Sequence, residues 1–168
     1  MSILDWGPLS RIRRNHGLEH ATLQILAKRN PAYRMAGYSD VRGFWLVGNV
    51  STAELQSAVE EALARMENGE HNLAIHPNCG TNFAAVGFLA GTAAWLAMLG
   101  AEKDWSKRFE RWPIVISLVT VVSILALPVG PLLQARLTTD GRPRGMRIAA
   151  IQRRNQGDVP LHRVLTEG

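Results

Sequence analysis

The segment His16-Gly17-Leu18-Glu19-His20 combines two imidazoles and a carboxylate at a spacing that can bind and use a metal ion. On an α-helix, residues three and four apart are neighbours, so His16, Glu19 and His20 would share one face. Two histidines one turn apart can bind Zn²⁺ through ring nitrogens, and a nearby glutamate can take a proton from a metal-bound water. The alternative is a polar helix face whose histidines are hydrogen-bonded to loops.

A second polar cluster, His76-Pro77-Asn78-Cys79, could complete such a site. The residue before a proline avoids helical geometry, which predicts an extended segment at His76. If a helix begins soon afterwards, Cys79 lies near its N-terminus, where the helix dipole favours a thiolate. The alternative is a connecting turn in which Cys79 is a small apolar filler.

These residues allow three functions, and the number of metal ligands distinguishes the first two. If His16, His20, His76 and Cys79 all bind zinc, the coordination shell is closed and the site is structural, as in a membrane scaffold. If only three bind, water can take the fourth position with Glu19 as general base, which gives a zinc-dependent hydrolase. Cys79 paired with His76 or His16 gives a third hypothesis, a thiol enzyme. We rank the scaffold first, the hydrolase second and the thiol enzyme third.

Local patterns around these residues predict an α+β domain. A helix from a cap at Ser10 to about Arg29 is expected to carry the first motif. A second, amphipathic helix begins at the capping-box pattern of Ser51 and Glu54. Strands are expected as a pair within 33–50, at 71–76, and at 145–153 and 160–166 around a turn at 155–158.

Two uncharged runs, 84–101 and 112–135, are each about long enough to cross a hydrocarbon core of ~30 Å. The first carries Gly87 and Gly91 at a spacing that favours close pairing with another helix or with a second copy of the chain. A charged link at 102–111 joins the runs. We expect a two-helix transmembrane hairpin. The alternative is a buried helical hairpin, for which little other apolar sequence remains as cover.

Charge and cysteine content indicate where the chain resides. Its formal net charge is +5, with seven arginines in the tail from Arg136 onward. The positive-inside rule then favours cytoplasmic termini, both on one side because the number of spans is even. Contact with the anionic headgroups of a lipid bilayer explains the excess of positively charged residues. No known nucleic-acid-binding motif accompanies the arginines. Residues 1–14 lack the apolar core of a signal peptide, and a single cysteine fits a reducing compartment.

Together, HGLEH at 16–20 and HPNCGTNF at 76–83 resemble the paired motifs of an uncharacterised bacterial membrane-protein family, a domain of unknown function. This resemblance implies a cell-membrane location and a shared site, without an assigned reaction. The first motif also has the H-x-x-E-H order of inverted zinc peptidases, but the chain shows no counterpart of their larger fold. The predicted organisation is an N-terminal α+β domain at 1–83, a transmembrane hairpin at 84–135 and a basic tail at 136–168.

Overall fold

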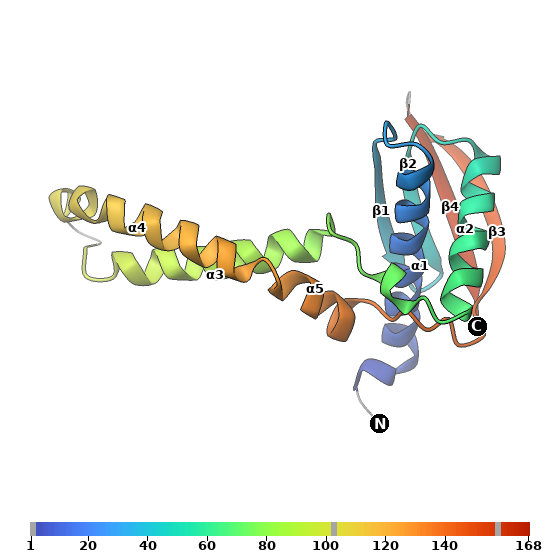
Figure 1. The fold of residues 1–168 in the computed structure, drawn as a ribbon, viewed down its shortest axis with the longest axis horizontal. Helices are drawn as coiled ribbons and strands as arrows, with labels where there is room; N and C mark the ends of the chain where they lie inside the picture. The colour runs from blue at the N-terminus through green and yellow to red at the C-terminus, as the bar shows by residue number, and fades with distance from the viewer. Residues whose placement is uncertain (1–2, 102–103, 157–158) are drawn as a thin grey trace. The chain divides into compact units, whose positions relative to one another are not determined.

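The computed structural model describes residues 3–101, 104–156 and 159–168. Two compact units make up the chain: Met1–His76 with Gln134–Gly168, and Pro77–Leu133. The first unit contains helices and an antiparallel sheet, and the second contains two long apolar helices (Figure 1). The predicted combination of an α+β domain with an apolar helix pair is confirmed.

A four-stranded antiparallel sheet forms one layer of the first unit, in the order β1-β2-β4-β3. β2 pairs with β4, with Phe44 opposite Val164, so segments from both ends of the chain share one sheet. Residues 157–158 of the turn predicted at 155–158 lie outside the described residues. The strands are β1 (Met35–Asp40), β2 (Gly43–Gly48), β3 (Arg147–Gln156) and β4 (Val159–Glu167).

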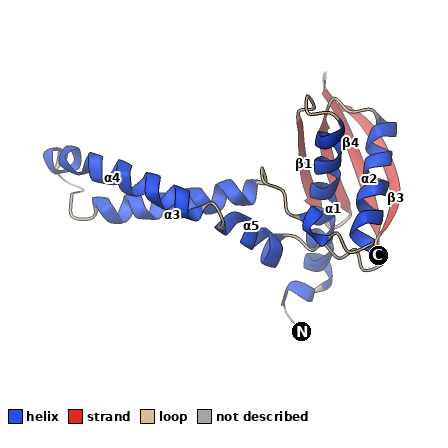
Figure 2. Cartoon of the chain, viewed as in Figure 1, coloured by secondary structure: helices blue, strands red, loops and turns tan. Residues whose placement is uncertain are grey.

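Two helices, α1 (Gly7–Arg29) and α2 (Thr52–Glu67), lie side by side on one face of this sheet (Figure 2). The core between helices and sheet is apolar, and Leu18, Phe44 and Val164 are fully buried in it. α2 begins at the predicted capping box: the Glu54 N–H donates to Ser51 Oγ at 3.2 Å, and the Ser51 N–H donates to the Glu54 carboxylate at 3.1 Å. This layer fixes α1, the helix that carries the first motif.

The start of α1 differs from the prediction. The helix begins at Gly7, with Pro8 in its first turn, rather than at Ser10. Proline fits there because the N–H groups of a first helical turn have no partner within the helix. Ser10 is therefore a buried residue inside the helix, 7% exposed, and does not cap it.

The strand predicted at 71–76 is wrong, because residues His71–Ala74 form a short 3₁₀ helix, η2. Its apolar residues pack against α1 instead of joining the sheet. Gln24 of α1 donates through Nε2 to the carbonyl oxygens of Leu73 at 2.8 Å and Ile75 at 3.0 Å. These side-chain bonds replace the ladder that a neighbouring strand would supply, so the segment needs no strand partner.

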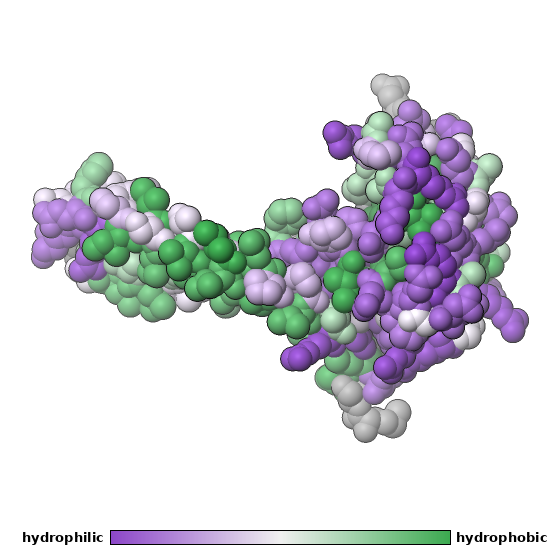
Figure 3. All heavy atoms as spheres, viewed as in Figure 1, coloured by the Kyte–Doolittle hydropathy of each residue, from purple (hydrophilic) through white to green (hydrophobic). Residues whose placement is uncertain are grey.

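The second unit consists of α3 (Gly80–Met98), α4 (Trp105–Ala126) and the short α5 (Val129–Leu133). α3 and α4 pack against each other, and Arg111 donates to the Ala97 carbonyl at 3.2 Å. Both are long and apolar enough to cross a membrane, with only 17% and 11% of their apolar windows buried. In Figure 3, apolar side chains cover much of the visible face of this pair, and hydrophilic side chains gather at one end of it. Residues 102–103 of the predicted link lie outside the described residues.

Candidate metal centre

His16 and His20 lie one turn apart on α1, as the motif predicts. Their ring centroids are 4.2 Å apart and the ring planes meet at 61°. Two imidazoles that share one tetrahedral zinc have ring centres about 5 Å apart, given Zn–N bonds of about 2 Å. His20 is buried, at 2% exposure, whereas His16 is partly exposed. The pair therefore has a separation close to that of two ligands on one ion.

Hydrogen bonds to backbone carbonyls fix the protonation of both rings. His16 Nδ1 lies 3.0 Å from the Thr138 carbonyl oxygen, and His20 Nδ1 lies 2.7 Å from the Ala74 carbonyl oxygen. A carbonyl oxygen can only accept, so each Nδ1 carries a proton and, in the neutral ring, the lone pair is on Nε2. Histidines that bind metals are commonly held by such a bond from the other ring nitrogen.

His76 lies beside the same pair within the first unit. The His76 ring centroid is 5.5 Å from that of His20. Gln134, which is fully buried, holds the His76 backbone: its Oε1 accepts from the N–H at 2.8 Å and its Nε2 donates to the carbonyl at 3.0 Å. The first unit thus brings three predicted histidines together. Gln134 was not identified from sequence, because no local pattern links it to a residue 58 positions away.

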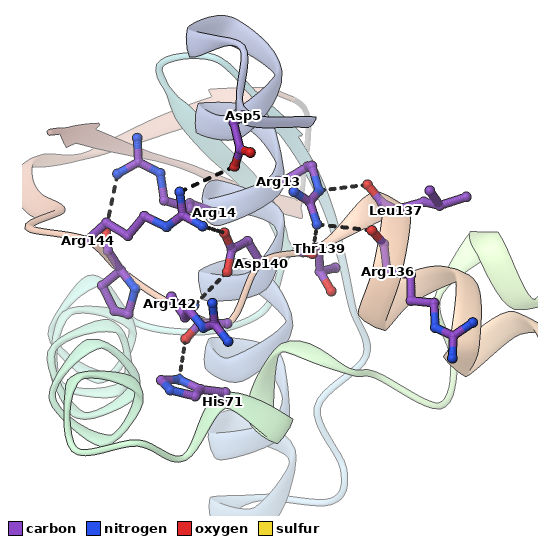
Figure 4. Close-up of polar contacts among 12 residues, drawn as sticks. Asp5, Arg13, Arg14, His71, Arg136, Leu137, Thr139, Asp140, Arg142 and Arg144 are labelled. Atoms are coloured by element: carbon purple, nitrogen blue, oxygen red, sulfur yellow. Dashed lines mark hydrogen bonds and ion pairs between the residues drawn. The ribbon is translucent and has the colours of Figure 1, made fainter. Parts of the chain in front are cut away.

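The carbonyl that orients His16 belongs to a π-helical turn, η3 (Gln134–Thr138). The last carbonyls of a helix lack partners within it, and Arg13 of α1 supplies donors to this end. Its Nε donates to Leu137 O at 2.8 Å and its Nη2 to Thr139 O at 2.9 Å (Figure 4). Arg13 thereby anchors the turn that presents Thr138 to His16.

Gly17 allows the segments that bear these carbonyls to approach α1. A Cβ at this position would lie 2.6 Å from the Asp140 carbonyl oxygen and 3.2 Å from Ala74 Cβ. Both distances are shorter than ordinary van der Waals contact, so a larger residue would push η2 and residue 140 away from the helix. The glycine in the middle of the motif is therefore a packing requirement of the histidine pair.

Glu19 is also buried, at 3% exposure, and contacts β1. Ser39 Oγ donates a short hydrogen bond to its carboxylate. The carboxylate lies against Gly37, where a Cβ would overlap it. A serine and a glycine from β1 thus hold this side chain, two partners that the sequence pattern did not identify.

Cys79 belongs to the second unit, where it is the N-cap residue of α3. Its side chain is buried at 7% exposure, and its Sγ accepts from the Thr81 N–H at 3.5 Å. A helix N-terminus favours the thiolate, the form that binds metal. Two imidazoles and a thiol, the donor types of His16, His20 and Cys79, are compatible with a metal site.

Comparison with known proteins places the chain among proteins without an assigned activity. A family model described as a domain of unknown function (DUF6391) matches residues 11–151. An uncharacterised protein of Picosynechococcus sp. is 45% identical over 98 residues, covering 51% of this chain and 48% of the relative. The match thus spans about half the length of that relative. No solved structure matches the chain.

Proposed function

We propose a structural zinc site as the function of this chain, which belongs to the family described as a domain of unknown function (DUF6391). His16, His20, His76 and Cys79 would supply three nitrogens and one sulfur, a closed set of the kind found in structural sites. Zinc has no redox chemistry and would act as a cross-link between these side chains. The cross-link would fasten α1 to the chain segment that leads into α3.

The observation that carries this proposal is the common orientation of His16 and His20. Each ring donates from Nδ1 to a carbonyl, so each presents Nε2 as the basic nitrogen. Histidines on a merely polar helix face have no need for the same tautomer or for ring centroids 4.2 Å apart. Cys79 follows His76 by three residues, which keeps their Cα atoms within about 11 Å of each other. Because the chain keeps Cys79 this near to His76, both residues could bind the same zinc ion.

We also propose that the second unit anchors the protein in the cell membrane as a two-span hairpin. The pairing of β2 with β4 requires the segments before α3 and after α4 to be on one side of any membrane. Two spans satisfy this requirement, since an even number returns the chain to its starting side. The arginines of the C-terminal segment favour a cytoplasmic location for both termini. The proposed ligand Cys79 would then directly precede the first membrane span in the sequence.

Metal content of the detergent-purified chain tests the zinc site. We expect near-stoichiometric zinc in the wild type by elemental mass spectrometry, and its loss in the His16→Ala/His20→Ala double variant. Cys79→Ser should retain less zinc after dialysis against a mild chelator. His71→Asn is the matched control, because His71 instead lies beside the Gly141 carbonyl, at 2.9 Å. Wild-type protein free of metal, or equal zinc in all four proteins, would contradict the proposal.

A zinc-dependent hydrolase is the second candidate, favoured by the burial of Glu19 one residue from His20. If one of the four ligands were displaced by water, Glu19 could accept its proton. Glu19→Gln distinguishes the two functions. A structural site predicts retained zinc and altered thermal stability, whereas a hydrolase predicts retained zinc and loss of peptide cleavage. Turnover of a fluorogenic peptide library by wild type alone would establish the hydrolase.

A further inference from the structure

The first unit contains a second polar site, a cavity of about 300 Å³ that none of His16, His20 and His76 lines. Its walls come from α1 (Arg13), from η2 and Ile75, from the first turn of η3 (Ala135) and from the loop that begins at Thr139. Figure 4 shows the charged groups that surround it. The wall residues that matter for its chemistry are Arg13, His71, Thr139, Asp140, Arg142 and Arg144.

Positive charge exceeds negative charge in these walls. Of the described residues that line the cavity, three are arginines and one, Asp140, is a carboxylate; its Oδ2 lies 3.3 Å from Arg144 Nη2. Arg144 also lies 3.6 Å from the carboxylate of Asp5. Among residues 3–101, 104–156 and 159–168, no carboxylate forms an ion pair with Arg13 or Arg142. The bonds of Arg13 run to neutral carbonyls, so its charge is not cancelled.

Arg14, the residue that follows Arg13, is also affected by the excess of positive charge. The Arg14 guanidinium donates to Pro143 O and to Gly168 O, both at 3.1 Å. Burial lowers the pKa of Arg14, and repulsion from Arg11 and Arg144 lowers it further. The two repulsive contributions, which Asp140 opposes, show that positive charge is concentrated beside the cavity.

A phosphate group matches the size and charge of this cavity. Guanidinium groups bind phosphate through paired, charge-assisted hydrogen bonds. A volume of about 300 Å³ is at the small end of ligand pockets, which suits one phosphate with a small substituent better than a nucleotide. His71 adds an imidazole to the wall.

Given the membrane anchor proposed above, only a short stretch of chain separates this cavity from the membrane-spanning unit. Wall residue Ile75 is two positions before Pro77, and wall residue Ala135 is two positions after Leu133, the limits of the second unit. α3 begins at Gly80, five positions after Ile75, which limits the distance between their Cα atoms to at most about 18 Å. A lipid phosphate at the membrane surface is thus one available source, and a soluble phosphate is the other.

We propose that the cavity lined by Arg13, Arg142 and Arg144 binds a phosphate monoester or inorganic phosphate, from either source. This proposal does not depend on bound zinc, although Arg13 and Ala74 contribute to both sites. Arg142 and Arg144 are the exposed members and bind the ligand directly, whereas Arg13 holds the wall in place through its backbone contacts.

Titration calorimetry on the full-length chain in a neutral detergent tests this proposal. The probes are inorganic phosphate, short-chain phosphatidic acid and short-chain phosphatidylcholine. We expect phosphate to bind wild type, and Arg142→Gln to weaken binding about tenfold, by analogy with the loss of one charge-assisted contact. Arg142→Gln/Arg144→Gln should abolish it. Arg154→Gln, an exposed arginine towards the other end of β3, is the matched control and should bind as wild type.

The probes separate the two sources of phosphate. Tighter binding of phosphatidic acid than of phosphate, with no binding of phosphatidylcholine, assigns the cavity to a lipid headgroup. Binding of phosphate alone assigns it to a soluble phosphate ester. Because Arg142 makes no ion pair with a described carboxylate, its variant should keep the wild-type melting temperature. Absence of phosphate and phosphatidic acid binding, or equal binding by Arg142→Gln and Arg154→Gln, would overturn the proposal.

Discussion

Gln134 binds both backbone polar groups of His76, accepting from its N–H at 2.8 Å and donating to its carbonyl at 3.0 Å. The glutamine is fully buried, and its two bonds to His76 are partly shielded from water. This pairing joins two segments that are 58 residues apart, one entering and one leaving the second unit. We therefore expect Gln134 to set the position of the His76 backbone relative to His16 and His20 on α1.

Replacement of Gln134 should weaken the metal site. Gln134→Ala removes both bonds and leaves two backbone groups of His76 without their partner, so we expect zinc affinity to fall by about 10- to 100-fold. Competition with a zinc indicator measures this change. Gln56→Ala, on the exposed face of α2, is the matched control. Unchanged zinc affinity in Gln134→Ala would show that His76 position does not matter for metal binding.

Gly17→Ala should destabilise the fold because its methyl group would lie 2.6 Å from the Asp140 carbonyl oxygen. Overpacking of this kind costs roughly 1–3 kcal/mol, which outweighs the helix propensity gained by alanine. Thermal unfolding followed by circular dichroism should show a melting temperature lower by several degrees. Gly7→Ala on the same helix has open space around it and should be neutral. Equal melting temperatures for both variants would contradict the close packing at residue 17.

His162 should make stability depend on pH. Burial lowers the pKa of His162 below its ordinary value of 6.5, and repulsion from Arg153 lowers it further. Its Nε2 lies 3.1 Å from Thr52 Oγ1, and the ring is fully buried. As pH falls through about 6.5, the unfolded chain binds this proton before the folded chain does, so the free energy of unfolding decreases. Above that pH the contribution is complete.

The variant His162→Gln isolates this effect from other groups that titrate. We expect its urea-unfolding free energy to change less than that of wild type between pH 7.5 and about 5. The difference between the two profiles is the contribution of His162. Parallel profiles would mean that the buried ring is not a source of acid sensitivity.

Fusion reporters test the membrane topology. A fluorescent protein fused after Gly168 should be bright, and alkaline phosphatase at the same position should be inactive, because we place both termini in the cytoplasm. Phosphatase fused after Ala101 should be active. The reverse pattern would place the termini on the other side, and inactivity at both positions would contradict a two-span hairpin.

Much of the fold could be predicted because its determinants are local. The capping box at Ser51 and Glu54, the apolar runs of α3 and α4, and the strand pairs β1–β2 and β3–β4 each depend on residues close in sequence, whereas the β2–β4 pair joins strands from opposite ends of the chain. The η2 segment was missed because its helical form depends on Gln24, nearly fifty residues away. Periodicity in six residues carries no information about such a partner.

The sequence pointed to the candidate residues of the site but not to the residues that hold them in place. The spacing of His16 and His20 on a helix follows directly from the helical repeat. The carbonyls of Thr138 and Ala74 hold the rings of His16 and His20, and the side-chain amide of Gln134 holds the backbone of His76. Backbone acceptors have no sequence signature, because every residue type has a carbonyl.

Zinc K-edge X-ray absorption on the full-length, zinc-loaded protein tests the proposed centre most directly. A site made by His16, His20, His76 and Cys79 predicts one sulfur at about 2.3 Å and three nitrogens at about 2.0–2.1 Å. In Cys79→Ser the sulfur shell should disappear while the nitrogen shell remains. A wild-type spectrum without sulfur, or with more than one sulfur per zinc, would contradict this ligand set.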